Sequence, residues 1–240
     1  MTTTARVHFN EDIQRAEAML DQAGVLEGAG ADQRLCQDVR IAAIAFSVGA
    51  MDAYLCDKYV DCLTKVLRAY VNGGWLGDLP ASYKKERLPA GDVLDTSRKS
   101  RTAWGIRMAA RSIMERDDLL SISRLEDMFN PVLPSGQKLW SEFISAMLDH
   151  GRKHLTGPKT AAEIAGLAGK HREIATKKAI DTVKKRIGAI IQIRHDWIHN
   201  CARPKTAIAK FTDGEARVRM LDIRLFVETF DDHIEAHRRA

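Results

Sequence analysis

Apolar residues recur every three to four positions along most of the chain, the spacing that places them on one face of an α-helix. This spacing predicts a first helix over residues 10–23, which ends at Gly24. A longer helix is predicted from about Ala31 to the Asn-Gly-Gly sequence at residues 72–74. The apolar stripe of this second helix is formed by Leu35, Val39, Ile41, Ala45, Val48, Leu55, Tyr59, Leu63 and Leu67.

The second half of the chain keeps the helical period and carries start and stop residues. Ser135 is the expected N-cap, and Gly151 the expected stop, of a helix between them. Thr160 and Glu163 have the spacing of a capping box, in which each side chain bonds the backbone amide of the other residue. Further helices are predicted over about 102–117, 121–130, 170–199 and 221–238, and the one place for a short strand or hairpin is 201–218.

These elements predict an all-α protein. Residues 75–97 are mostly polar with glycine and proline, which indicates a loop between helices. The chain is therefore expected to form one helical-bundle domain over residues 1–240, with a loop-rich insertion at about 71–100. A hydrophobic content of 45% and a charged content of 29% are ordinary for a globular protein with a core.

Cysteine usage and the N-terminal sequence predict a soluble cytoplasmic protein. The four cysteines show no CxxC spacing and no disulfide or zinc-finger pattern, so free thiols in a reducing compartment are expected. The first residues contain no apolar segment of a secretory signal. The longest uncharged run, 41–51, is far shorter than the ~20 residues that span a bilayer, so no membrane is expected.

Two charged residues interrupt apolar stripes. Arg194 occupies a core-spaced position of the 170–199 helix, and Asp52 does the same between Val48 and Leu55. A buried charge without a partner is costly, so such a residue is paired, hydrated or functional. One interpretation is that both residues reach water at a helix edge. The other, which we expect, is that Arg194 and Asp52 face one hydrated cleft.

The sequence IQIRHDWIHN, residues 191–200, concentrates polar chemistry in apolar surroundings. His195 and His199 are four residues apart, as two zinc ligands on a helix would be, but Asp196 stands where zinc metalloproteases have glutamate and no third ligand has a family spacing. Alternatively, the two histidines interact with the dipole at the helix C-terminus. We expect no metal and no cofactor at this motif. The zinc interpretation and the helix-dipole interpretation nevertheless stay open as alternatives.

A third interpretation is RNA cleavage. It requires proton transfer at the ribose 2′-hydroxyl and at the leaving oxygen, together with stabilisation of charge on the phosphate. Histidine titrates near neutral pH and suits the proton transfers, and the arginine fork holds two phosphate oxygens. Arg194 and His199 supply part of this set, and a second copy of the chain would supply the rest.

The chain contains an R-x4-H sequence, in which four residues separate Arg194 from His199. This sequence resembles the R-x4–6-H signature of the HEPN ribonucleases. The sequence SVGAMDAYLCDKYVD also resembles the early HEPN helix that carries an acid followed by an aromatic residue, here Asp52 and Tyr54. The layout is most similar to the stand-alone RiboL-PSP branch. The resemblance in sequence covers these two helices. The remaining bundle resembles the family only in its all-α fold class.

The resemblance implies a HEPN-like helical homodimer with a composite site and metal-independent endoribonuclease activity, in toxin–antitoxin or antiviral defence systems. Products would carry a 2′,3′-cyclic phosphate and a 5′-hydroxyl. In HEPN toxins that are paired with nucleotidyltransferase antitoxins, a tyrosine typically follows the histidine by two residues. Here that residue is Cys201, which gives no support for control by tyrosine modification. The expected partners are RNA, with tRNA one candidate, and an antitoxin or defence-system protein.

The resemblance assigns roles to individual residues. His199 would be the acid/base group and Arg194 the phosphate-binding group, with Asp52 supporting Arg194. The supporting or RNA-binding residues would be His195, Asp196, Asn200, Lys184, Lys185 and Arg203. The alternative is a non-catalytic HEPN-like module that dimerises or binds RNA or protein.

The charge distribution favours RNA binding. The whole chain has a net charge of +5, whereas residues 168–205 alone contain ten basic and three acidic residues, an excess of seven positive charges. Residues 81–111 hold eight basic and three acidic residues. Aromatic residues are only 6% of the chain, so recognition through phosphates is expected rather than base stacking.

Overall fold

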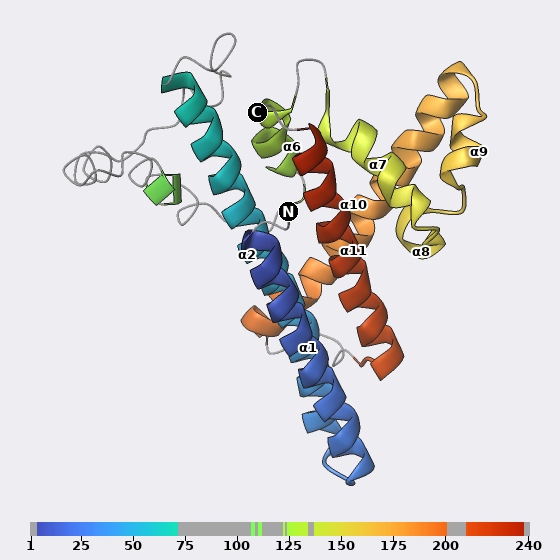
Figure 1. The fold of residues 1–240 in the computed structure, drawn as a ribbon. Coiled ribbons are helices and arrows are strands. Elements are labelled where there is room, and N and C mark those ends of the chain that lie inside the picture. The colour runs from blue at the N-terminus through green and yellow to red at the C-terminus, as the bar shows by residue number, and fades with distance from the viewer. Residues whose placement is uncertain are drawn as a thin grey trace, which may run out of the picture. The chain divides into compact units, whose positions relative to one another are not determined.

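The computed structural model describes residues 4–71, 107–108, 110–111, 122, 124–133, 137–200 and 210–237. The regular structure in these ranges is helical, with no strand, so the predicted all-α fold is confirmed (Figure 1). The predicted loop-rich insertion falls almost wholly outside the described residues. The described elements are α1 (Thr4–Gly28), α2 (Gln33–Val71), α6 (Arg124–Phe129), a 3₁₀ turn η1 (Asn130–Val132), α7 (Leu139–Asp149), α8 (Lys153–Thr156), α9 (Ala161–Ala165), α10 (Gly169–Asn200) and α11 (Asp213–His237).

The chain divides into two compact units. The first unit contains Met1–Tyr54 and Phe143–Asp231, and the second contains Leu55–Glu142 and Asp232–Ala240. Helices α2, α7 and α11 each contribute residues to both units. The expectation of a single domain over residues 1–240 stays a prediction.

The core of the first unit is aromatic. Phe143 meets Phe226 edge to face, with ring centroids 5.4 Å apart, and Phe230 lies 5.9 Å from Phe143 and 6.5 Å from Tyr54. Such edge-to-face pairs add stability beyond the burial of their area. The Tyr54 hydroxyl donates a 2.8 Å hydrogen bond to the buried carboxylate of Asp231, so the one polar atom of this tyrosine is satisfied.

Ion pairs connect the helices that surround this core. Arg40 of α2 is buried. Its guanidinium donates a 2.5 Å hydrogen bond to Asp213 at the start of α11 and also contacts Glu27 of α1. Burial opposes the charge on Arg40, but the hydrogen bonds that it donates to Asp213 and Glu27, together with the negative charges of these carboxylates, outweigh burial and raise the pKa of the guanidinium. In the same unit, α1 and the first half of α2 lie side by side as a helical hairpin (Figure 1).

Helix α10, which carries the R-x4-H sequence, contacts two of its neighbours through one buried acid. The carboxylate of Asp222 in α11 accepts a 2.7 Å hydrogen bond from Arg186 Nε of α10 and lies 2.7 Å from His154 Nε2 of α8. Asp222 is 1% exposed, and its contacts with Arg186 and His154 offset part of the cost of removing the carboxylate from water. This contact joins α8, α10 and α11 within the first unit.

Several predicted boundaries are wrong. Helix α1 runs from Thr4 to Gly28 and passes through Gly24, which was expected to end it. It ends instead at Gly28, and the φ of 76° at Gly30 lets the amides of Gly30 and Ala31 donate to carbonyls of the last turn. Leu35, expected in the core stripe of α2, is 48% exposed; Cys36 is buried in its place.

The later helices follow the sequence signals more closely. Helix α7 stops before Gly151, whose φ is 64°, as expected. Its first amide, Leu139 N, is capped by the Asn130 side chain at 2.8 Å, while the expected cap Ser135 lies outside the described residues. The capping box of Thr160 and Glu163 at the start of α9 is confirmed.

Helix α11 begins eight residues before the predicted start near Leu221, because a second capping box starts it. Thr212 Oγ1 accepts from the Glu215 amide at 3.2 Å, and the Glu215 carboxylate accepts from the Thr212 amide at 2.8 Å. The expected hairpin over 201–218 is therefore wrong for residues 213–218, which are helical. Residues 201–209 lie outside the described part of the chain.

We expect Thr212→Ala to lower the free energy of unfolding by about 1 kcal/mol at neutral pH, the usual effect of removing a threonine cap. The backbone and side-chain hydrogen bonds from Thr212 lower the pKa of Glu215. The stability linked to Glu215 is therefore present above its ordinary pKa and is lost as the pH falls through the lowered one. Urea unfolding from pH 7 to pH 3 should show the difference from wild type shrinking, whereas Thr182→Ala, within α10, stays within about 0.5 kcal/mol of wild type throughout. A Thr212→Ala difference that grows in acid would contradict this account.

The cysteines and α2 bear on the predicted location. Cys36, Cys56 and Cys62, the cysteines among the described residues, are not joined in disulfides. Over Gln33–Tyr70, α2 is long and apolar enough to cross a bilayer, yet 61% of its most apolar window is buried, as in the core helix of a globular protein. A cytoplasmic location stays a prediction.

Candidate functional site

The apolar stripe of α10 is buried in the middle of the helix, from Ala179 to Ile190, and not at its C-terminal end. Ala179, Val183, Ile187 and Ile190 are buried in the core of the first unit. After Ile190, none of the described side chains of α10 is buried. The helix therefore projects its last turns beyond the core that holds its earlier part.

The projecting end is apolar as well as uncovered. Ile191, Ile193 and Trp197 are half-buried, and Ile198 is 50% exposed. An exposed apolar group of this kind, edged by polar residues, is typical of a protein–protein contact. The predicted site residues Arg194, His195, Asp196 and His199 share this end of the helix.

Arg194 is half-buried, as expected for a charge on an apolar stripe. Within the described ranges it makes no hydrogen bond and no ion pair. The nearby acid Asp196 instead accepts a 2.8 Å hydrogen bond from Gln192 on the same helix. The described part of this chain therefore leaves the guanidinium donors of Arg194 unused.

The two histidines of the motif lie together on one face. His195 and His199 are exposed, and their ring centroids are 4.4 Å apart with 51° between the ring planes. His199 lies in the last turn of α10, where a charged imidazole would also interact with the helix dipole. The structure therefore brings the two histidine rings together. It also leaves open the alternative that these histidines interact with the dipole at the end of the helix.

Helix geometry separates the two residues of the R-x4-H sequence. Side chains five positions apart point about 140° apart around a helix and lie about 7.5 Å apart along its axis. Arg194 and His199 of one chain therefore do not face the same point, unlike residues three or four apart. The two side chains of this sequence therefore do not meet on one face of α10.

The remaining predicted site residues are spread around the first unit. Lys184 is half-buried and Lys185 exposed, both about 13–15 Å before Arg194 along the helix. Asp52 in α2 is half-buried, with one carboxylate oxygen buried. The shared cleft of Asp52 and Arg194 stays a prediction. The side chain of Asn200, and all of Arg203, lie outside the described residues.

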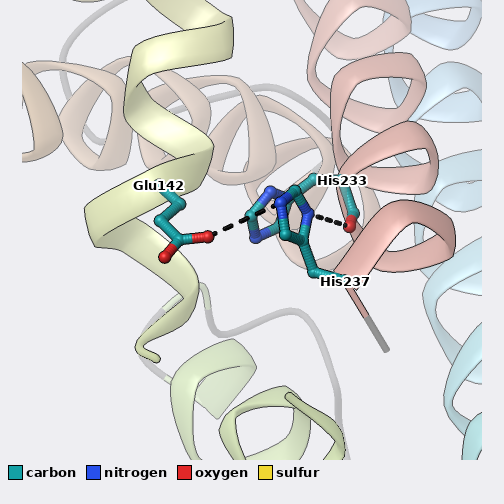
Figure 2. A group of neighbouring side chains, drawn as sticks. All are labelled: Glu142, His233 and His237. Carbon is teal, nitrogen blue, oxygen red and sulfur yellow. Dashed lines mark hydrogen bonds and ion pairs between the residues drawn. The ribbon is translucent and has the colours of Figure 1, made fainter. Parts of the chain in front are cut away.

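A second cluster of titratable residues, absent from the sequence predictions, lies in the second unit. His233 and His237 of α11 face Glu142 of α7, and one ligand atom from each residue lies within 4.8 Å of the others (Figure 2). Burial lowers the pKa of His233, and the neighbouring His237 lowers it further, while Glu142 raises it. Among the described residues, no other three histidine, cysteine, aspartate or glutamate side chains lie close enough together to share a metal ion. His195 and His199 therefore have no third metal ligand among the described residues.

Sequence reasoning missed this cluster for a physical reason. The sequence HIEAH, residues 233–237, does carry the four-residue spacing of paired ligands on a helix. Glu142, however, is about ninety positions earlier, and only the packing of α7 against α11 within the second unit places it there.

Comparison with known proteins found no match: no family model, no curated protein and no solved structure resembles this chain closely enough to be matched.

Proposed function

We propose that this chain is a metal-independent endoribonuclease of the HEPN type that works as a homodimer, as a toxin or an antiviral defence effector. One observation carries the proposal. Arg194 is half-buried at the uncovered apolar end of α10, has no ion pair among the described residues, and shares that end with the exposed His199. Arginine and histidine are the pair that phosphodiester cleavage needs without a metal.

The chemistry assigns one task to each group. The 2′-oxygen attacks the adjacent phosphorus while His199 of one or the other copy removes the 2′-proton or protonates the leaving 5′-oxygen. The new P–O2′ bond and the broken P–O5′ bond leave a 2′,3′-cyclic phosphate and a 5′-hydroxyl. Arg194 stabilises the negative charge that builds on the phosphate oxygens, which a planar guanidinium can hold in pairs.

The rest of α10 supports binding of a polyanion. Along the helix the exposed basic side chains are Lys170, Arg172, Lys177, Lys178 and Lys185. Such a row attracts a phosphate backbone without reading its sequence. RNA, with tRNA one candidate, is therefore the proposed substrate, and an antitoxin or defence-system protein the proposed regulator.

Dimerisation through the end of α10 is the step to test first. We expect wild type to sediment as a dimer and to cleave total RNA or tRNA in the presence of EDTA. Ile198→Asp should weaken the dimer at least about tenfold, because a charge in an interface core costs more than about 1.4 kcal/mol, and cleavage should fall with it.

Ile174→Asp is the matched control, since Ile174 is 56% exposed at the opposite end of the same helix. It should remain dimeric and active, with a circular dichroism spectrum like that of Ile198→Asp. A folded Ile198→Asp variant that is still dimeric and active would contradict the use of this face. A wild-type dimer that binds RNA without cleaving it would instead favour a non-catalytic HEPN-like module.

A further inference from the structure

The chain contains two histidine pairs with the same spacing on a helix. His195 and His199 of α10 have ring centroids 4.4 Å apart, and His233 and His237 of α11 have centroids 4.5 Å apart. They differ in what lies opposite. The α11 pair faces the carboxylate of Glu142, which projects from α7 toward the two imidazoles (Figure 2).

We propose that Glu142, His233 and His237 bind a divalent transition-metal ion, with Zn²⁺ the natural candidate. Imidazole nitrogen and carboxylate oxygen are ligands that zinc prefers, and two histidines with one glutamate form a known zinc-binding set. The three ligand atoms all lie within 4.8 Å of one another. The sequence predicted no metal, and this site does not depend on the ribonuclease proposal.

Hydrogen bonding fixes the orientation of His237. Its Nδ1 lies 2.9 Å from the backbone carbonyl oxygen of His233, one helical turn earlier, so Nδ1 carries the proton and donates. In the neutral ring, Nε2 is then left with its lone pair. Metal-binding histidines are held in this way, with the second ring nitrogen bonded to a carbonyl or carboxylate.

The second ring nitrogen of His237, Nε2, faces the carboxylate of Glu142, with which a protonated imidazole would form an ion pair. Nε2 lies 3.7 Å from Oε2 of Glu142. This separation is longer than the roughly 3.2 Å limit of an N–H···O hydrogen bond. Tetrahedral zinc, with bonds of about 2.0–2.2 Å, holds its ligand atoms about 3.3–3.5 Å apart, so a shared cation fits between these atoms after a small side-chain movement.

Burial around the cluster gives the ion both an anchor and an entry path. His233 is buried, whereas Glu142 is exposed and His237 half-buried. A metal can therefore enter from the Glu142 side and keep a water molecule as its fourth ligand. Once bound, it would link α7 to α11 within the second unit, so metal binding should raise thermal stability.

The test uses full-length protein treated with EDTA, dialysed, and titrated with ZnCl₂ by calorimetry, with thermal unfolding followed in parallel. Wild type should bind one Zn²⁺ per chain and unfold at a higher temperature when loaded. Glu142→Gln and His237→Gln should each weaken binding at least about tenfold and lose the thermal shift. Both residues are solvent-accessible, so their apo forms should match wild type by circular dichroism.

His195→Gln is the matched control, because it disrupts the other histidine pair and leaves the α7–α11 cluster intact. It should bind Zn²⁺ as wild type does. Absence of saturable binding in wild type would overturn the proposal, as would Glu142→Gln and His237→Gln variants that bind equally well. Loss of binding in His195→Gln, or a thiolate charge-transfer band on loading with CoCl₂, would place the metal elsewhere and would also overturn it.

Discussion

Replacing His199 by alanine is expected to lower the rate of RNA cleavage by about 10²–10⁴-fold, the usual contribution of a general acid or base. In a symmetric dimer the change removes this group from both chains. Protein stability should change little, because His199 is exposed and its interaction with the helix dipole is worth only about 0.3–1 kcal/mol. Initial rates on a labelled RNA, measured with EDTA present, would give the ratio.

His171→Ala is the control for this substitution, since His171 is an exposed histidine near the start of the same helix. It should cleave at the wild-type rate. If His199→Ala unfolds in parallel with its loss of activity, or cleaves as fast as wild type, the histidine serves the helix end rather than catalysis. The two alternatives left open by the sequence are thereby separated.

Phe226→Ala is expected to lower the free energy of unfolding by about 3–5 kcal/mol. Phe226 is fully buried, meets Phe143 edge to face and stacks on Phe230 at 6.2 Å, so truncation opens a cavity among three aromatic rings. The same helix carries Asp222, which anchors α10, so RNA cleavage should be lost at temperatures where the variant melts.

Urea unfolding with a shift in midpoint at unchanged slope would measure this effect. Phe226→Leu, which keeps most of the volume, should cost less than about 1.5 kcal/mol. Val218→Ala, at a partly exposed position of α11, should stay within about 0.5 kcal/mol of wild type. A Phe226→Ala variant as stable as Val218→Ala would show that the aromatic cluster is not the core of the first unit.

The elements that could be predicted were those with local signals. The capping box of Thr160 and Glu163 needs only four consecutive residues, and the positive φ of Gly151 follows from its place after an apolar stripe. Helix α10 was predicted within one residue at each end because its apolar period extends over several turns. Local chemistry decided each of these cases.

The wrong predictions concern features that are determined by contacts between residues far apart in the sequence. Gly24 lowers local helix propensity, but α1 continues through it while packing near Asp213 of α11, so tertiary contacts override the propensity. Leu35 was placed in the core because one sequence does not distinguish neighbouring faces of α2. The buried face there contains Arg40, whose partners Glu27 and Asp213 come from two other helices.

The candidate site divides in the same way. Arg194, His195 and His199 are close in sequence, so their common place at the end of α10 was predictable. The exposure of that end could not be predicted, because it depends on which surfaces the rest of the first unit leaves exposed. Nor could the sequence place Glu142 against His233 and His237, since that contact requires two helices far apart along the chain.

The central claim is that the Arg194–His199 sequence cleaves RNA through its 2′-hydroxyl. The most direct test is expression of wild type and His199→Ala in cells, followed by sequencing of RNA ends with selective capture of 5′-hydroxyl and 2′,3′-cyclic phosphate termini. Wild type should generate new 5′-hydroxyl ends, each matched by a cyclic phosphate on the upstream fragment, and His199→Ala should generate neither. Equal numbers of such ends in both samples, or new ends that carry a 5′-phosphate, would contradict it.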